Sequence, residues 1–562
     1  MPSNNASSAP ESPAIPKAQE NPWYIRHFIK LLIGFGLGGG AVALILPLVL
    51  WLHCGMSSGS SDQLRLHLLY VTGGIIAVLT LLQTNWKNQG DRLKIDADIK
   101  KNEQDAEKNE RDHIRQVHTE RRSRYTKAVE QLADEKATVR LGGIYTLVGL
   151  VDEWLADDTL EAEEQQKEGQ VIINNLCSYI RSPFPLAEKI EEYEARKALE
   201  NLQKLESEKL DEEVSSRIQI LLKRFKDSDE YEKPEDITAD YAKFHEEQDV
   251  RRTIFVEMSK RSSTFTMNEK EEIIETFSGL WSDFDFDFSR APVFYPLNAI
   301  TIEKGNFSSA KFYSNADFSR ATFTQTADFS RATFTQTADF SGTIFAQTAD
   351  FSGTKFTQTA YFSGAKFAQT AYFNWTKFTQ KADFSWTKFT QTVYFSWTKF
   401  TQKADFSWTK FTQTSYFSGV KFTHKADFSR ATFTQTAYFD RAKFFQTADF
   451  SWARFFQTAD FRGGTFVQNA NFSGTTFEKH SPHFVATTHG KSGKAYRARF
   501  AALSKKQPAH NFAVHEDSRP ILLGETELGN IKYNLPMGTV LFDPCSWDEE
   551  KKEYTRVSEP AK

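Results

Sequence analysis

A phenylalanine recurs at alternating intervals of five and six residues between Phe307 and Phe477, thirty-two times in all. A short period sustained over so many copies indicates a solenoid of stacked coils. In the unit 327–337, a small residue stands two positions before each phenylalanine. Because side chains two residues apart point the same way in an extended chain, we expect Ala327 and Phe329 to face one interior. The second pair of the unit follows the same rule, so a corner between the pairs must turn the chain inward again.

An α-helix is the competing interpretation of this spacing. At about 100° per residue, a helix would place the phenylalanines on two stripes roughly 140° apart and not on one face. The residues between them are mostly Thr, Tyr, Trp, Ser and Gly, with hardly any Leu or Glu, which also disfavours a helix. The pattern therefore predicts β-structure.

A second period of twenty-two residues is superimposed on the first. Tyrosines and aspartates alternate at this interval, at Tyr372, Tyr394, Tyr416 and Tyr438 and at Asp383, Asp405, Asp427 and Asp449. If one coil has four short sides of this length in total, like residues stack in ladders along one face. Recent duplication of a twenty-two-residue block produces the same pattern without a structural cause, and the two explanations are compatible.

This stretch resembles the pentapeptide-repeat proteins, whose A(D/N)LXX unit is matched by residues 327–331 and again by 332–336. The resemblance implies a right-handed, four-sided (quadrilateral) β-helix with the central residue of each unit inside. The chain differs in having Phe in place of Leu. It also adds one residue per ten, at the position of Thr337 or Lys381, which we interpret as a bulged corner. We assign 281–480 to this solenoid, with the regular part at 305–480.

Two apolar runs precede the repeats. Residues 31–52 contain no charged side chain, and residues 66–82 contain only His67 as an ionisable group. A hydrocarbon core of ~30 Å needs about twenty apolar residues per helix. We therefore predict two transmembrane α-helices within 29–83, joined by a short outside loop, and a disordered N-terminal tail at 1–28. A cleaved signal peptide is the weaker alternative, because the first run is long and a second one follows.

Lysine and arginine flank these runs unevenly. Lys17, Arg26 and Lys30 precede the first run and five basic residues at 87–101 follow the second, whereas the 53–65 loop holds only Arg65. The positive-inside rule then places both termini in the cytoplasm. The expectation is a multi-pass protein of the cell membrane.

The region between the apolar runs and the repeats reads as helical. We predict a charged helical stalk at 84–135 and an α-helical cytosolic module at 136–280, its last helix at 249–278. A charged helical insertion at 186–228 fits either a helical hairpin or an oligomerising coiled coil, so a homo-oligomer is left open. Residues 125–132, 139–145 and 171–177 resemble the helical module of membrane-attached bacterial pentapeptide-repeat proteins, which implies a bacterial source.

The end of the chain, 481–562, loses the repeat. We predict a partly disordered C-terminal tail. Short apolar segments at 519–523 and 538–544 are candidates for strands that cap the open end of the solenoid.

Patterns for catalysis or ligand chemistry are weak. The three cysteines, Cys54, Cys177 and Cys545, are too far apart in the sequence for a disulfide framework or a zinc site. The segment 489–492, His-Gly-Lys-Ser, lacks the first glycine of a phosphate-binding loop. The histidines His480, His483 and His489 lack the spacing of a metal site. We predict no enzyme, no cofactor and no metal.

The candidate site is an interaction surface on the rod. Five tryptophans stand two positions after a core phenylalanine, at Trp375, Trp386, Trp397, Trp408 and Trp452. This position should point outward at a corner, and exposed Trp beside the four tyrosines of the ladder favours recognition of a protein partner of unknown identity. Alternatively, the indoles lie along the rod and shield its corners.

The charge of the rod separates two functions. Some pentapeptide-repeat proteins resemble duplex DNA through acidic rods and bind DNA gyrase. Here residues 307–477 hold twelve Lys and six Arg against ten Asp and no Glu, a net charge of +8, opposite to a DNA mimic. We therefore expect a membrane-anchored scaffold and no specific nucleic acid. Gyrase or DNA interaction, or contact of the basic rod with anionic lipid or nucleic acid, is the alternative.

Overall fold

The computed structural model describes residues 22–204, 212–225, 233–268, 273–486, 496–504, 507–529, 531–551 and 553–562. The predictions for residues 1–21 and 489–492 lie outside this part of the chain. Two compact units divide the protein at His118/Thr119, and helix α4 (Ser58–Leu132) contributes to both.

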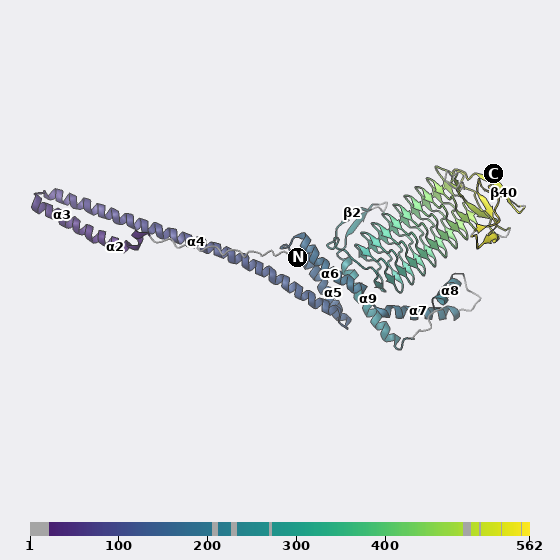
Figure 1. Ribbon diagram of the computed structural model, residues 1–562, viewed down its shortest axis with the longest axis horizontal. Helices are drawn as coiled ribbons and strands as arrows, with labels where there is room; N and C mark the ends of the chain where they lie inside the picture. The colour runs from purple at the N-terminus through teal and green to yellow at the C-terminus, as the bar shows by residue number, and fades with distance from the viewer. Residues whose placement is uncertain are drawn as a thin grey trace, which may run out of the picture. The chain divides into compact units, whose positions relative to one another are not determined.

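The first unit is a pair of apolar helices (Figure 1). One runs from Phe28 to Cys54 as α2 (Phe28–Ile33), a π-helical segment (Gly34–Gly38) and α3 (Gly39–Cys54). The other is the start of α4. Both are long and apolar enough to cross a membrane, by length and composition. A short helix, α1 (Trp23–Arg26), lies in the range predicted as a tail.

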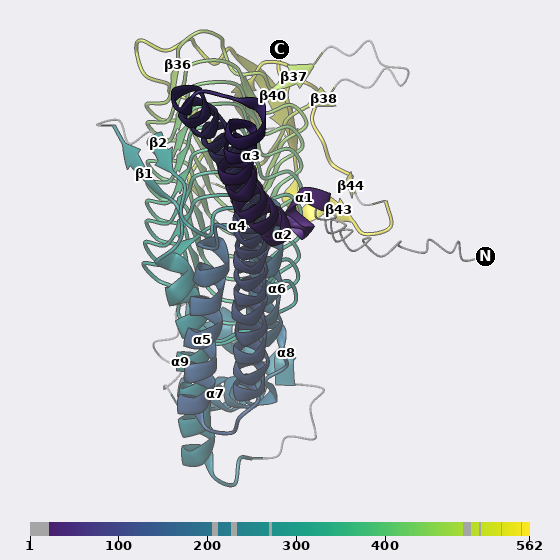
Figure 2. The same cartoon turned by 90° about the vertical axis from the view of Figure 1, so that its left-hand side faces the viewer.

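Close contacts join the two apolar helices, which lie side by side in both views (Figures 1 and 2). The Ser61 hydroxyl donates a hydrogen bond to the Pro47 carbonyl oxygen at 3.2 Å. A Cβ atom on Gly39 would lie 2.2 Å from Cγ2 of Thr72. Glycine at this position therefore lets the backbones approach, as small residues do in paired membrane helices.

The second unit begins with a helical module. Its helices are α5 (Ala137–Leu155), α6 (Ala162–Arg181), α7 (Pro185–Lys204), α8 (Glu212–Phe225) and α9 (Ile237–Ser259). Apolar residues at helical spacing in α5, α6 and α9, such as Ile144, Ile173 and Ile254, are fully buried. The Arg251 guanidinium is buried as well, pairing with Glu247 at 2.7 Å and donating to the Ile180 carbonyl oxygen at 2.9 Å. A buried cation needs such partners, and these tie α9 to α6.

Two details depart from the predicted helices. The last helix ends at Ser259, and an antiparallel hairpin, β1 (Thr264–Met267) with β2 (Ile273–Phe277), occupies the end of the range predicted as helical. Thr, Ile and Phe are strand-forming residues, which explains the change. The insertion forms a helical hairpin within the described residues, α7 lying against α8.

The repeats form a four-sided β-helix with two-residue strands, and the chain visits four parallel sheets in a fixed order. The first sheet, the tyrosine face, has β5 (Gly305–Asn306), β9 (Ala327–Asp328), β13 (Ala349–Asp350), β17 (Ala371–Tyr372), β21 (Val393–Tyr394), β25 (Ser415–Tyr416), β29 (Ala437–Tyr438) and β33 (Ala459–Asp460). The next, the lysine face, has β3 (Pro292–Val293), β6 (Lys311–Phe312), β10 (Thr333–Phe334), β14 (Lys355–Phe356), β18 (Lys377–Phe378), β22 (Lys399–Phe400), β26 (Lys421–Phe422), β30 (Lys443–Phe444), β34 (Thr465–Phe466), β39 (Arg499–Ala501) and β42 (Val540–Phe542).

Opposite these lie two further sheets. The aspartate face has β7 (Ala316–Asp317), β11 (Ala338–Asp339), β15 (Ala360–Tyr361), β19 (Ala382–Asp383), β23 (Ala404–Asp405), β27 (Ala426–Asp427), β31 (Ala448–Asp449) and β35 (Ala470–Asn471). The fourth face has β4 (Thr301–Ile302), β8 (Thr322–Phe323), β12 (Ile344–Phe345), β16 (Lys366–Phe367), β20 (Lys388–Phe389), β24 (Lys410–Phe411), β28 (Thr432–Phe433), β32 (Arg454–Phe455) and β36 (Thr476–Phe477). Residues twenty-two apart pair in register on every face, so the predicted ladders are confirmed.

The phenylalanines fill the interior of the rod. Phe329 and Phe334 are fully buried, and so is Ala327, which confirms the predicted inward direction. Two kinds of corner alternate around each coil. After Phe329 the chain turns through Arg331, whose φ is +58°, whereas after Phe334 it bends through 335–337, where the added residue lies.

Both ends of the rod are covered. At the first coil, Phe255 of α9 packs on Phe288 and Phe307, with ring centroids 4.7 and 6.2 Å apart. At the other end, β39 pairs with β34 and β42 with β39, so the tail continues the lysine face. The strands therefore meet other strands or the helical module at both open edges, where solenoids are otherwise prone to associate.

The described part of the tail is folded, and the prediction of partial disorder for 481–562 stays a prediction. Its further strands are β37 (Val485–Ala486) with β38 (Tyr496–Arg497), β40 (Leu523–Leu528) with β41 (Ile531–Pro536), and β43 (Trp547–Asp548) with β44 (Glu553–Tyr554). The 538–544 segment supplies β42, whereas 519–523 contacts the rod through a hydrogen bond from the Arg519 N–H to the Phe477 carbonyl oxygen, 2.8 Å long.

Candidate interaction surfaces of the rod

The five predicted tryptophans lie at the corners that follow the tyrosine and aspartate faces. All five have left-handed backbone conformations, with φ between +58° and +63°. Their exposed fractions run from 41% at Trp408 to 67% at Trp375. Glycine occupies the equivalent corner in other coils, for example at Gly353 and Gly364. Glycine adopts this conformation without strain, whereas a bulky residue does not.

The indoles stack along the rod. Trp375 and Trp397 have ring centroids 5.6 Å apart, and Trp386 and Trp408 have centroids 4.8 Å apart, with both pairs nearly parallel. The Trp397 ring lies over the next corner, where a Cβ on the glycine at 419 would approach it to 3.0 Å. The tryptophans are thus exposed and also lie along the rod, so the two predicted orientations hold together.

The four predicted tyrosines form one ladder on their face. Consecutive ring centroids from Tyr372 through Tyr394 and Tyr416 to Tyr438 are 5.2, 4.9 and 5.0 Å apart, and each pair is parallel. The nine candidate residues nevertheless form two groups. Trp375 and Trp397 adjoin the tyrosine ladder, whereas Trp386, Trp408 and Trp452 line the diagonally opposite corner.

Acidic charge on the rod is largely neutralised at the aspartate face. Lys403 pairs with Asp405 at 2.8 Å, and Lys425 pairs with Asp427 at 2.9 Å and with Asp449 of the next coil at 3.3 Å. Burial would raise the pKa of Asp405, but hydrogen bonds from Lys403 and Ser407 outweigh it and lower the pKa. This face therefore holds ion pairs and offers little net charge to a partner.

The lysine face carries a long ladder of basic residues, and Lys366, Lys388 and Lys410 form a shorter one on the fourth face. Lys355, Lys377, Lys399, Lys421 and Lys443 are in-register neighbours, and in the part of the chain that the structure describes none of the five forms an ion pair. Burial lowers the pKa of Lys377, and the charges of Lys399, Lys355 and Lys223 lower it further. Like charges at strand spacing repel. These five lysines lie apart from the aspartates, whereas Lys403 and Lys425 pair with them.

A groove of about 870 Å³ separates α8 from this face. The hairpin is held over the first coils by the ion pair of Lys311 with Glu188, 2.8 Å long. Burial raises the pKa of Glu191 beside it, although Arg224 opposes the shift. Lysines from the rod and Lys223 of α8 line the groove, so the charged residues of its walls are mostly basic.

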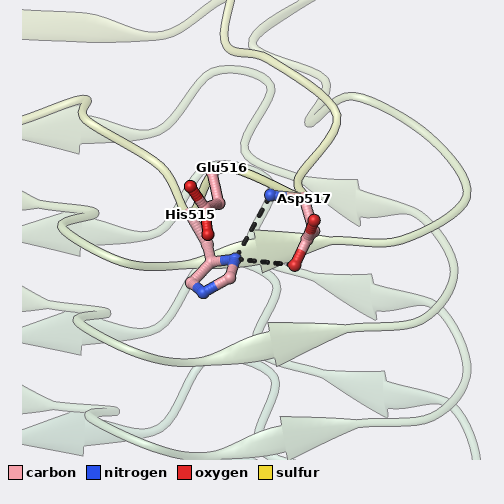
Figure 3. A group of neighbouring side chains, drawn as sticks. All are labelled: His515, Glu516 and Asp517. Carbon is pink, nitrogen blue, oxygen red and sulfur yellow. Dashed lines mark hydrogen bonds and ion pairs between the residues drawn. The ribbon is translucent and has the colours of Figure 1, made fainter.

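Metal ligands lie together once among the described residues, at His515, Glu516 and Asp517 (Figure 3). The His515 Nδ1 atom lies 3.5 Å from Asp517 Oδ2 and accepts a hydrogen bond from the Asp517 N–H at 3.2 Å. Glu516 and Asp517 are exposed. A turn in water makes these contacts without an ion, so they do not define a metal centre.

The cysteines lie in different regions of the fold. Burial raises the pKa of Cys177 to about 12, which makes it an unreactive core thiol, whereas Cys54 and Cys545 are exposed. His489 lies outside the described residues.

Comparison with known proteins concerns the rod alone. The family model of pentapeptide repeats (9 copies) matches residues 307–355, 351–396, 417–465 and 428–476. Searches of curated proteins and of solved structures gave no match. The matched ranges lie within the stretch in which the four faces are regular.

Proposed function

We propose that this pentapeptide-repeat protein is a non-enzymatic, membrane-anchored scaffold whose rod binds a protein partner through its aromatic corners and tyrosine face. A pentapeptide-repeat β-helix is a protein-interaction rod in its general architecture, because its coils expose long, regular faces. The choice of faces and the membrane anchor are the specific parts of the proposal.

The strained and exposed tryptophans carry the argument for recognition. At a corner where Gly353 or Gly364 needs no strain, Trp375 or Trp386 holds a left-handed backbone and leaves over half of its surface in water. Residues kept in such conformations cluster at functional sites. Trp and Tyr are also the residues that contribute most to protein interfaces. The corner at Trp375 and Trp397 adjoins the tyrosine ladder, so this side offers the larger continuous aromatic surface.

The repetition of the faces supports a non-enzymatic role. Each ladder presents the same side chain at successive coils, as at Tyr394 and Tyr416. Catalysis needs unlike groups that converge on one substrate. A binding surface, in contrast, gains from repetition.

Binding is tested by affinity capture with the full chain in detergent. A double variant, Trp375→Gly with Trp397→Gly, removes the aromatic corner beside the tyrosines without backbone strain. The matched control, Trp386→Gly with Trp408→Gly, makes the same change on the opposite corner. We expect the first variant to lose a captured protein that the control retains. Capture of the same proteins by both variants and the parent would refute the proposed surface.

The membrane anchor is supported by the two apolar helices and by the distribution of Lys and Arg around them. The natural cysteines allow a direct test. The proposed topology puts Cys54 outside and Cys545 in the cytosol, and both thiols are exposed. A membrane-impermeant maleimide should label Cys54 in intact bacteria and reach Cys545 only after lysis. Labelling of Cys545 in intact cells would overturn the topology.

The lysine face favours one alternative function, contact of the rod with DNA or anionic lipid. Its ladder from Lys355 to Lys443 has five basic side chains in register, against three in the ladder from Lys366 to Lys410 on the fourth face. Such binding weakens steeply with salt. Retention on duplex DNA or anionic vesicles near 0.15 M salt, lost on Lys377→Glu with Lys399→Glu, would support this alternative over the protein scaffold.

A further inference from the structure

We propose that a pocket at the C-terminal end of the lysine face binds a nucleotide through its phosphates. The cavity has a volume of about 680 Å³ and lies between the last coils of the rod and the β43–β44 hairpin. This volume is in the range of small-molecule sites, roughly 300–1,000 Å³. None of the five corner tryptophans lines it, so the inference does not depend on the proposed scaffold function.

Cations dominate the pocket wall. Five basic side chains line it, against one carboxylate, Glu549: Lys421, Arg441, Lys443, Arg497 and Arg499. Lys421, Lys443 and Arg499 come from three strands of the lysine face, β26, β30 and β39. Phosphates are the anions that such mixed Arg and Lys sites recognise best, because guanidinium groups bind two oxygens at once.

Three of these cations lack an acidic partner. Among the described residues, Lys421, Lys443 and Arg499 have no carboxylate within 4 Å. Arg441 reaches Asp440 only at 3.9 Å, and Arg497 donates to the Gly538 carbonyl oxygen at 2.9 Å. Burial and the neighbouring Lys399 and Lys443 lower the pKa of Lys421, as expected where repulsion between cations is not relieved. An anion with several charges would relieve it.

Aromatic rings distinguish a nucleotide from a bare phosphate. Tyr496, Trp547 and Tyr554 line the same pocket. Trp547 and Tyr554 meet edge to face with centroids 5.0 Å apart, and each of Trp547 and Tyr496 leaves about two fifths of its surface exposed. A nucleobase can stack on such rings, as bases stack on aromatic side chains in single-strand binding proteins, and this stacking adds to the affinity. Inorganic phosphate or a lipid phosphate would use the cations and leave the rings unused.

Strand pairing explains why the pocket exists at this end of the rod. β39 and β42 continue the lysine face beyond β34, and β43 follows β42 directly in the chain. The ladder therefore reaches under a hairpin that carries the aromatic rings. Cations on strands are held more rigidly than cations on loops, which favours a defined site.

Calorimetric titration of the purified full chain with ATP, ADP, AMP and pyrophosphate tests the proposal. We expect affinity to fall from ATP to AMP. Arg499→Ala and Lys443→Ala should each weaken ATP binding by about tenfold, the size of one lost charge-assisted contact. Lys410→Ala, the same change on the fourth face, is the matched control and should leave binding unaltered. Unfolding curves check that each variant is folded.

A second variant tests the rings. Trp547→Leu should weaken ATP but not pyrophosphate. Binding of ATP and pyrophosphate with equal affinity, or an unchanged ATP affinity in both Trp547→Leu and Arg499→Ala, would overturn the proposal, as would the absence of binding at millimolar ATP.

Discussion

The rings of Phe384 and Phe406 lie nearly parallel with their centroids 4.9 Å apart, although twenty-two residues separate them in the chain. Both side chains are fully buried. The same contact repeats along the rod, so each phenylalanine is packed by the coil before and the coil after it.

Truncating one ring should open a cavity that the stacked coils cannot close. We expect Phe384→Ala to lower the free energy of unfolding of the rod by about 3–5 kcal/mol. Phe384→Leu should lower the free energy of unfolding clearly less, because leucine keeps most of the apolar volume. Urea denaturation followed by circular dichroism measures both, and equal losses for the two variants would show that the stacking contact is not the source of stability.

The left-handed corners predict a backbone effect that is separate from packing. Gly353 has φ of +68°, and a Cβ there would meet only the Arg331 side chain, at 3.7 Å. Gly353→Val should therefore destabilise the rod through backbone strain alone, by about 1–2 kcal/mol. Gly353→Asn is the control and should cost less, because Asn tolerates this conformation. Similar costs for Val and Asn would contradict the assignment of the loss to strain.

Two glycines of the helical module, Gly169 and Gly149, test how closely the module packs against the start of the rod. A Cβ on Gly169 would lie 2.5 Å from the Phe284 ring, whereas a Cβ on Gly149 meets nothing within 4 Å. Gly169→Ala should lower the melting temperature, since either the helix or the ring must move. Gly149→Ala should raise it slightly, because alanine gains about 1 kcal/mol over glycine in a helix. Thermal melts that shift the same way for both variants would argue against the close packing of α6 on Phe284.

The tail should lose stability in mild acid because of His510. Burial lowers the pKa of His510 to about 4, although a hydrogen bond to the Ala501 carbonyl oxygen opposes the shift. Its Nδ1 atom accepts from the Ala470 N–H at 3.1 Å, which requires a neutral ring. Because the unfolded histidine titrates near 6.5, this stability is complete above that pH and is lost as the pH falls toward 4.

The loss between pH 7 and pH 5 should be up to about 2 kcal/mol. Hydrogen exchange of the β39 amides at the two pH values measures it. His510→Gln should be less stable at pH 7 but should show little further change at pH 5. An unaltered pH dependence in that variant would assign the effect to another group.

The sequence was sufficient to predict the repeat because every coil carries its own copy of the packing signal. Ala327 and Phe329 have the same environment as their counterparts twenty-two residues on, so the period alone reveals which side chains lie inside. The hairpin β1–β2 was not predicted, since the helical pattern of α9 outweighs the strand-forming Thr and Ile residues that follow it.

Some features of the candidate sites could also be predicted from the sequence, and others could not. The exposure of Trp375 follows from its position two residues after a core phenylalanine. The segregation of Lys377 from Asp383 follows from the twenty-two-residue interval once the four sides are assigned. The pocket at the end of the rod cannot be read in this way, because Arg499 and Tyr554 meet Lys421 only through the pairing of distant strands.

The order of the four faces determines which insertion lengths keep like residues stacked on one another. Inserting or deleting twenty-two residues would add or remove one rung from every ladder and leave tyrosine on tyrosine and lysine on lysine. An insertion of eleven residues would keep every phenylalanine inside and yet turn all later coils by half a revolution, so that tyrosines continue on aspartates. The interior tolerates either length, whereas the exterior stays in phase only for the longer one. Growth of the rod in blocks of twenty-two is therefore a requirement of its surface and not of its core.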